Sequence, residues 1–134
     1  MKKAKDRYIY PAVFSYDEDG ISVTYPDLPG CFTCAETTED ALYMAQDALK
    51  LHLYGMEEEQ EKLPQPSDLT KLGSNQNEKV VLVEAYMPPF RDAMMNKAVK
   101  KTLTIPKWLD QLAVRNKVNF SQVLTEALKV KLGV

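Results

Sequence analysis

The sequence has few of the residues that carry most catalytic and metal-binding chemistry. Its 134 residues include one histidine, His52, and two cysteines, Cys31 and Cys34. A catalytic nucleophile needs a base beside it, and a structural zinc site takes about four Cys or His ligands. We therefore expect no catalytic residue, no metal site and no cofactor.

The two cysteines have the C-x-x-C spacing that occurs in redox pairs and in halves of zinc sites. The residues between them, Phe32 and Thr33, favour a strand, and side chains three apart in a strand point to opposite faces. We therefore interpret Cys31 and Cys34 as two small strand residues, without a disulfide or a shared metal. His52 falls on the apolar face of a predicted helix, which favours a structural role.

A long hydrophobic run is also absent. No apolar run approaches the roughly 18–20 residues that cross a bilayer as a helix. The basic start, residues 1–5, is not followed by the apolar stretch of a signal peptide. We expect a cytoplasmic protein without a membrane partner.

Charge is distributed unevenly, although the net charge is only −2. Residues 1–90 contain 8 Lys/Arg and 16 Asp/Glu, a net charge of −8, whereas residues 91–134 contain 9 Lys/Arg and 3 Asp/Glu, a net charge of +6. A basic segment suits phosphates, and an acidic one suits a basic partner. The asymmetry predicts two functions on one chain, against the alternative of a surface segregated by chance.

The first 87 residues predict an α+β layer, in which one helix packs on a mostly antiparallel sheet. Gly20 supplies a turn between the first two strands, and Thr37 resembles a helix N-cap. The apolar run Val80–Val83 predicts a buried fourth strand. We predict strands at 8–16, 21–25, 31–35 and 79–86, and a helix from Thr37 that fades at 57–59. Its apolar face comprises Ala41, Ala45, Ala48, Leu49, His52 and Met56, widened by Leu42 and Leu53.

The last 35 residues predict one strand and two short amphipathic helices. Residues 100–106 alternate and end at a proline, residues 107–116 form the first helix, and Asn119 is the N-cap of the second. Residues 91–99 are either helical or flexible. So small a segment buries little surface, and a single strand leaves its backbone unpaired.

Both defects disappear if two copies interlock, with antiparallel strands and a shared helical core. We predict that this dimer core consists of Leu103, Ile105, Leu109, Leu112, Phe120, Val123, Leu124, Ala127 and Leu128. The opposite ribbon face then presents Lys100, Thr102 and Thr104, and a two-stranded ribbon fits the DNA major groove. Asn119, Phe120 and Ser121 begin the second helix, where backbone N–H groups suit a phosphate.

This arrangement resembles the ribbon-helix-helix family of repressors, from Lys100 to about Leu132. Lys101 departs from the pattern because it lies on the core-facing side of the alternation, where we expect its stem to be buried and its ammonium to reach water. The alternative is a dimerisation module without a role on DNA.

The first part of the chain contains four notable segments: Tyr8–Phe14, Gly20–Cys31 with its PDLPGC run, the helix start Thr37–Ala41, and Leu63–Ser67. In these segments the chain resembles the HicB antitoxin family. It implies a partial ribonuclease-H-like fold and a partner toxin, HicA, which is a small basic RNA-cleaving protein. It also implies that the antitoxin covers the toxin's active surface and represses the shared operon.

We therefore expect an antitoxin and operator-binding repressor that works as a homodimer or a higher even oligomer. Residues 1–90 are the expected toxin-neutralising domain, residues 91–99 a linker, and residues 100–134 the DNA-binding and dimerisation domain. We expect Asp27 and Glu36 to contact the toxin.

Two alternatives belong to other classes of protein. One is a stand-alone regulator whose first strand lines a ligand pocket with Tyr8, Tyr10, Phe14 and Tyr16, although core packing explains those aromatics more simply. The other is a nuclease, which needs several carboxylates around Mg²⁺. Its candidates are Asp17, Glu18, Asp19, Asp27 and Glu36; the first three fall in one turn, and nothing indicates that they converge.

Overall fold

The computed structural model describes residues 4–73 and 75–134. The contacts divide the chain into two compact units, one that ends at Lys97 and one that spans Ala98–Val134. We call the first unit the body and the second the arm. No helix within the described residues is both long and apolar enough to cross a membrane.

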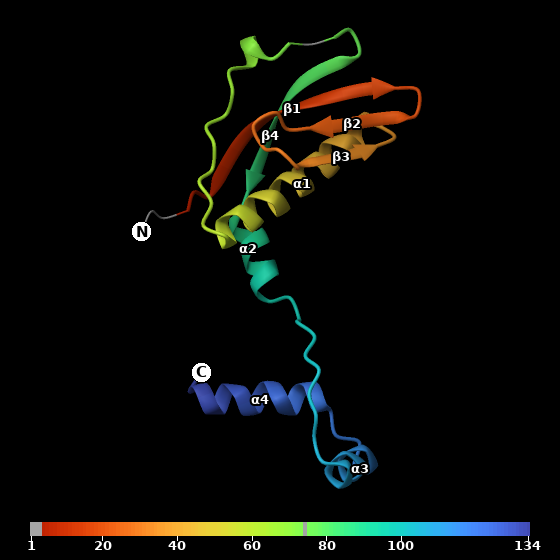
Figure 1. Ribbon diagram of the computed structural model, residues 1–134, viewed down its shortest axis with the longest axis vertical. Helices are drawn as coiled ribbons and strands as arrows, with labels where there is room; N and C mark the ends of the chain where they lie inside the picture. Colours follow the sequence, from red (N-terminus) through yellow and green to blue (C-terminus); the bar gives the residue numbers. More distant parts are fainter. Residues whose placement is uncertain (1–3, 74) are drawn as a thin grey trace. The chain divides into compact units, whose positions relative to one another are not determined.

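The body contains a four-stranded antiparallel sheet (Figure 1). The turn between the first two strands needs Gly20, whose φ is +133° and whose added Cβ would lie 3.0 Å from the Ala35 carbonyl oxygen. The predicted glycine turn is therefore confirmed. The strands are β1 (Arg7–Asp17), β2 (Gly20–Thr24), β3 (Phe32–Ala35) and β4 (Glu78–Tyr86), in the order β3-β2-β1-β4.

Helix α1 (Thr38–Glu58) packs on one face of this sheet and closes the core. Its first turn is capped as predicted, because the Thr37 hydroxyl accepts a hydrogen bond of 3.1 Å from the Asp40 backbone N–H. Leu42 is 39% exposed, so its predicted place on the buried face is wrong. The buried side of α1 is formed by Ala41, Ala45, Leu49 and Leu53, which meet Tyr10, Phe14, Val23 and Val83 from the sheet.

The predicted burial of the fourth strand is correct for one face of the strand only. Val83 and Ala85 are buried, whereas Leu82 and Tyr86 are 53% and 42% exposed. Strand β4 lies at the edge of the sheet, and the core forms on the α1 side. Because side chains alternate along a strand, Leu82 and Tyr86 face solvent while Val83 and Ala85 face the core.

The two cysteines are both free, and Cys31 precedes β3 instead of lying within it. Its backbone N–H donates to the Leu28 carbonyl, and its thiol donates to the Ala48 carbonyl of α1 at 3.6 Å. Burial raises the pKa of the Cys31 thiol to about 11. Cys34 is exposed, so the two side chains have different surroundings, as expected.

Between α1 and β4 the chain runs back over the body as an extended segment, residues 60–68, which we call the strap. The Tyr10 hydroxyl donates to the Pro64 carbonyl at 2.6 Å. Asp27 accepts two hydrogen bonds from Ser67, one from its backbone N–H at 2.9 Å and one from its hydroxyl. These contacts hold the strap against β1 and the loop that follows β2. A short 3₁₀ turn (Leu69–Lys71) follows the strap.

The segment whose structure the sequence leaves open begins with a helix, α2 (Pro88–Met95). The Arg91 guanidinium donates to both carboxylate oxygens of Glu57, at 3.0 and 2.7 Å, and Phe90 meets Tyr54 edge to face. The hydrogen bonds to Glu57 raise the pKa of Arg91. Helix α2 is thereby tied to the last turn of α1.

The arm contains two helices, α3 (Lys107–Arg115) and α4 (Phe120–Leu132). The turn between them places Lys117 at φ +55°, and Asn119 caps α4 by accepting from the Gln122 backbone N–H at 3.1 Å, as predicted. Residues 100–106 pair with no strand of the described chain. The sequence predicts this strand only between two copies, so that part stays a prediction.

Candidate functional sites on the body and the arm

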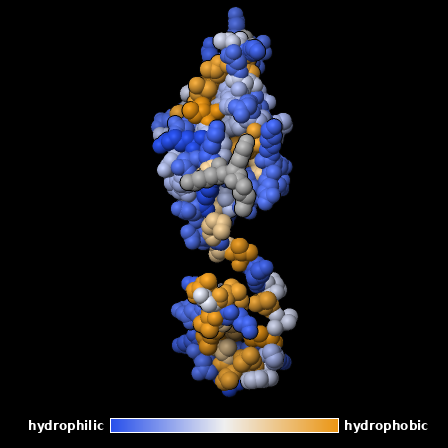
Figure 2. Space-filling view, turned by 90° about the vertical axis from the view of Figure 1, so that its left-hand side faces the viewer, coloured by the Kyte–Doolittle hydropathy of each residue, from blue (hydrophilic) through white to orange (hydrophobic). Residues whose placement is uncertain are grey.

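The arm exposes the residues that the sequence assigns to a dimer core. Seven of the nine are 40–63% exposed, from Leu109 at 40% to Leu103 at 63%. Of the other two, Leu124 is half-buried and Ala127 is exposed. Figure 2 shows apolar side chains gathered on the visible face of the arm. Contiguous apolar surface of this kind is typical of an interface, because leaving it in water is costly.

The predicted DNA-binding residues lie at two places in the arm. Lys100, Thr102 and Thr104 are exposed in the extended segment before α3. Phe120 and Ser121 are exposed at the start of α4, where the Asn119 side chain is occupied by the cap. A helix N-terminus attracts phosphate through its free N–H groups and dipole.

The predicted toxin contacts on the body differ in their surroundings. Asp27 is half-buried, and both of its carboxylate oxygens accept hydrogen bonds from Ser67. Glu36 is exposed one residue before the cap of α1. The sequence offers no local signal for the Asp27–Ser67 contact, because the two residues are 40 positions apart.

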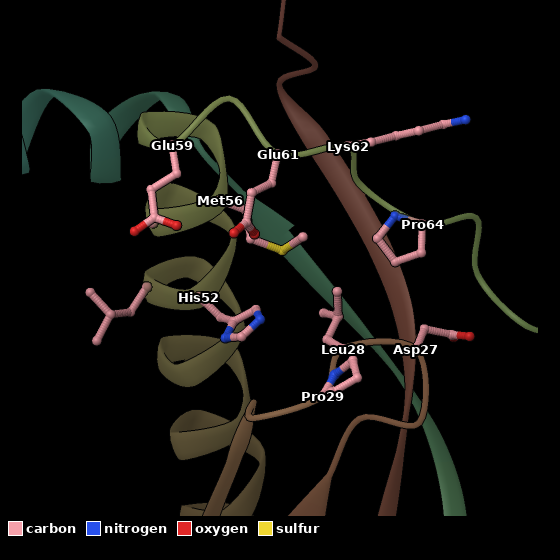
Figure 3. A pocket seen from close by; sticks show the side chains of 11 residues that line it. Asp27, Leu28, Pro29, His52, Met56, Glu59, Glu61, Lys62 and Pro64 are labelled. Carbon is pink, nitrogen blue, oxygen red and sulfur yellow. The ribbon is translucent and has the colours of Figure 1, made fainter.

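A hollow of about 800 Å³ opens on the body between the C-terminal half of α1, the loop after β2 and the strap. Figure 3 shows its side chains. Its apolar lining includes Leu28, Pro29, Leu51, Met56 and Pro64; its polar lining includes Asp27, His52, Glu59, Glu61 and Lys62. Such a mixed hollow suits a ligand that has both an apolar part and a charge.

Gly55 lies within α1 and lines this hollow. Glycine in a helix costs roughly 0.5–1 kcal/mol relative to alanine. A Cβ added at Gly55 would meet no atom within 4 Å, so packing within the chain does not require glycine there. The helix ends with Gln60 at φ +57°, a conformation that glycine would adopt more easily than glutamine. The glycine is therefore beside the hollow and not where the backbone needs it.

The charge around the hollow is predominantly negative. The last turn of α1 contains acidic residues and no basic one, although a helix C-terminus favours cations. Arg91 neutralises Glu57, at 2.7 Å, on the side of α2. Figure 3 shows the Glu61 side chain directed toward Met56 and Lys62 directed away. Among the ion pairs of the described residues, none includes Glu59 or Glu61.

The structure also places the residues that the metal, catalytic and ligand-pocket alternatives depend on. No group of three His, Cys, Asp or Glu side chains in residues 4–73 and 75–134 is placed to hold a metal ion. His52 is half-buried in the hollow, with its Cε1 atom 3.9 Å from the position of a Cβ added at Gly30. Tyr10 and Phe14 are buried in the core, with Tyr8 and Tyr16 packed against it. The aromatic face of β1 therefore fills the core.

Comparison with known proteins gives a consistent family. A family model described as "HicB_like antitoxin of bacterial toxin-antitoxin system" matches residues 10–128. An uncharacterised 14.9 kDa protein of Haemophilus phage HP1 is 32% identical over 130 residues, which cover 90% of this chain and 97% of that protein. Antitoxin HicB 2 of Photorhabdus laumondii is 43% identical over 58 residues, or 43% of this chain and 42% of that protein.

A solved structure extends the likeness to three dimensions. A chain of a toxin-antitoxin complex from Streptococcus pneumoniae aligns with a TM-score of 0.59 and 30% identity. The alignment covers 93% of this chain and 99% of that one, so it includes residues of both the body and the arm.

Proposed function

The chain belongs to the HicB-like antitoxin family of bacterial toxin-antitoxin systems, and from this we propose that it neutralises a HicA-type toxin and represses its own operon as a DNA-bound dimer. The body, as a partial ribonuclease-H-like domain within residues 1–90, covers the active surface of the small basic RNA-cleaving toxin. Residues 91–99, the first of which belong to α2 of the body, lead to a ribbon-helix-helix domain at 100–134. Neutralisation is by occlusion, so the chain itself needs no catalytic residue.

Charge supports the toxin as partner of the body. Residues 1–90 have a net charge of −8, and a basic RNA-binding surface would be attracted to it over about a Debye length. The similar chain from Streptococcus pneumoniae is part of a toxin-antitoxin complex. Asp27 and Glu36 remain the contacts that we propose from the sequence; the engagement of Asp27 by Ser67 leaves Glu36 as the freer carboxylate.

The observation that carries the repressor function is the exposed apolar face of the arm. Leu112, Phe120 and Val123 are 47%, 45% and 52% exposed in the single chain. A second copy would cover them, pair the two segments at 100–105 into a ribbon, and turn Lys100, Thr102 and Thr104 toward the major groove. The arm's excess of basic residues suits the phosphate backbone.

The first test is the mass of the full chain in solution by light scattering, alone and with the small basic protein encoded by the adjoining reading frame. A dimer or larger even oligomer that takes up near-stoichiometric toxin is the expected result. A monomer would contradict the two-stranded ribbon and the DNA binding that depends on it. A chain that ignores the basic protein would remove the antitoxin function.

The second test compares operator binding by Thr102→Ala/Thr104→Ala with binding by Thr125→Ala. Thr125 is exposed on α4, and its hydroxyl donates to the Ser121 carbonyl within the helix, so it serves as a control away from the ribbon. Each lost base-edge contact should cost roughly 1–3 kcal/mol and lower the preference for the operator over unrelated DNA. Retention of full preference by the ribbon variant would contradict the assignment.

A further inference from the structure

We propose that the hollow at the end of α1 receives a lysine or arginine side chain of the toxin, a role that presupposes the antitoxin function proposed above. The hollow is an open depression of about 800 Å³ on the body. Its occupant can be identified from three features of the lining: shape, charge and the glycine at its edge.

The apolar lining fits the stem of a long basic side chain. Leu28 is buried beneath the surface, Met56 is half-buried, and Leu51 is 57% exposed. Lysine and arginine bury their methylene stems on such surface while the charged end reaches polar groups. A purely apolar occupant would leave the carboxylates around the hollow without a partner, at a cost in desolvation.

The charge of the lining selects a cation. Glu59 and Glu61 line the hollow, and the C-terminal dipole of α1 adds partial negative charge beside them. Lys62 also lines the hollow, but its side chain points away from Met56 (Figure 3). Arg91 is paired with Glu57 and does not neutralise Glu59 or Glu61. A lysine or arginine that enters the hollow would therefore meet a negative potential.

Gly55 gives the occupant access to the helix backbone. Since none of the described residues would meet a Cβ at this position within 4 Å, the space beside Gly55 is open to a partner. A larger residue at position 55 would project into the hollow without disturbing the core, because Gly55 is exposed. This makes position 55 a probe that changes the hollow and preserves the fold.

The test measures binding of the full chain to the basic protein from the adjoining reading frame, produced as an inactive variant that the host cell tolerates. Gly55→Leu should fill the hollow and weaken binding at least tenfold, whereas Gly55→Ala should change the Kd less than threefold. Both variants should melt at or above the temperature of the parent chain, because each replaces a helical glycine. Wild-type affinity of Gly55→Leu would overturn the proposal.

A charge test uses a matched pair of double variants. Glu59→Lys/Glu61→Lys should weaken binding at least tenfold more than Glu18→Lys/Asp19→Lys, which makes the same change in net charge at the exposed β1–β2 turn. Equal losses of affinity would mean that only net charge matters, and would refute the hollow as the docking site.

The two proposals can fail separately. If the parent chain binds the toxin and the hollow variants bind equally well, the docking site is wrong and the antitoxin function stands. If the parent chain fails to bind, the antitoxin function itself falls.

Discussion

The body and the arm have similar local sequence patterns but complete their cores differently. In the body, α1 covers one face of the sheet, and Phe14, Val23, Leu49 and Leu53 are 0–1% exposed. In the arm, whose residues are all described, no side chain is buried, and only Ala113 and Leu124 are half-buried. Apolar periodicity therefore predicts which face of a helix or strand will be buried. It does not show whether that face is buried by the same chain or by another.

The difference follows from size and topology. About 90 residues with four strands and a long helix can close two layers around a core, whereas fewer than 40 residues rarely do so alone. Helix α4 of the arm is well capped, by Asn119 at its start and by Gly133 at φ +74° at its end. Its local structure is thus specified in the single chain, and the missing stabilisation is tertiary. The predictions that follow alter one unit and use the other as a reference.

The largest effect should come from Leu112→Asp. Leu112 is 47% exposed in the single chain, so aspartate would be harmless there, but in the proposed dimer it would place a charge in each half of the core. Truncation of a buried leucine alone costs about 2–5 kcal/mol, and the uncompensated charge adds to this. We expect a monomer with no measurable operator binding and an unchanged unfolding transition of the body. Light scattering and circular dichroism provide the measurements.

The control is Val130→Asp, since Val130 is 82% exposed on α4 and lies outside the proposed core. It should leave the dimer intact. A Leu112→Asp chain that remained dimeric at micromolar concentration would show that the two copies associate through another surface.

The next largest effect should come from Phe14→Ala in the body. Phe14 is 1% exposed, and truncation of a buried phenylalanine costs about 3–5 kcal/mol. Urea denaturation should show this loss in the body's transition, while the mass of the dimer stays the same. Phe32→Ala, at a residue 71% exposed on β3, should cost less than about 0.5 kcal/mol. Similar losses for the two variants would contradict the assignment of the core.

The sequence predicts the four strands and α1 of the body and the two helices of the arm, because capping and periodicity are local signals. The glycine turn at Gly20 and the caps at Thr37 and Asn119 are confirmed by the structure. The sequence fails where a residue's surroundings depend on distant segments. An apolar run such as Val80–Val83 is compatible with a central or an edge strand, and only the strand order shows that β4 lies at the edge.

The candidate site on the body shows the same limit. Neither the Asp27–Ser67 contact nor the Arg91–Glu57 pair follows from spacing, since their partners are 40 and 34 residues apart. The hollow is formed by three separate segments, so no single motif indicates it. One signal was available, namely the glutamates that end α1 without a basic residue, against the preference of a helix C-terminus.

Alkaline pH should lower the stability of the body, by less than Phe14→Ala does. Cys31 and Tyr25 belong to the body, and burial raises the pKa of both; that of Cys31 rises from 9.0 to about 11. Their neutral forms are favoured by folding, so this stability is fully present below pH 9 and is lost as pH rises through about 11. For Cys31 the loss is at most about 3 kcal/mol. The arm contains neither cysteine nor tyrosine.

Thermal unfolding between pH 7 and 11 measures this loss. Cys31→Ser should reduce the decline of the body's transition, because serine stays neutral over this range. Cys34→Ser, at the exposed cysteine, should leave the decline unchanged. An equal response of the two variants would mean that the buried thiol does not govern the pH dependence.

The smallest effects should come from the two helix caps, which are chemically matched. Thr37→Ala and Asn119→Ala each remove a side-chain acceptor at 3.1 Å from a backbone N–H, at a cost of about 1 kcal/mol. In the body this cost appears once and is independent of protein concentration. In a dimeric arm whose helices unfold on dissociation it appears in both copies, so it should raise the dimer dissociation constant about thirtyfold, since every 1.4 kcal/mol is a factor of ten. Asn119→Asp keeps the cap but adds negative charge beside the proposed phosphate site, so it should preserve the dimer and weaken operator binding. If Asn119→Asp bound the operator as tightly as the parent chain, the start of α4 would stabilise the arm without contacting DNA.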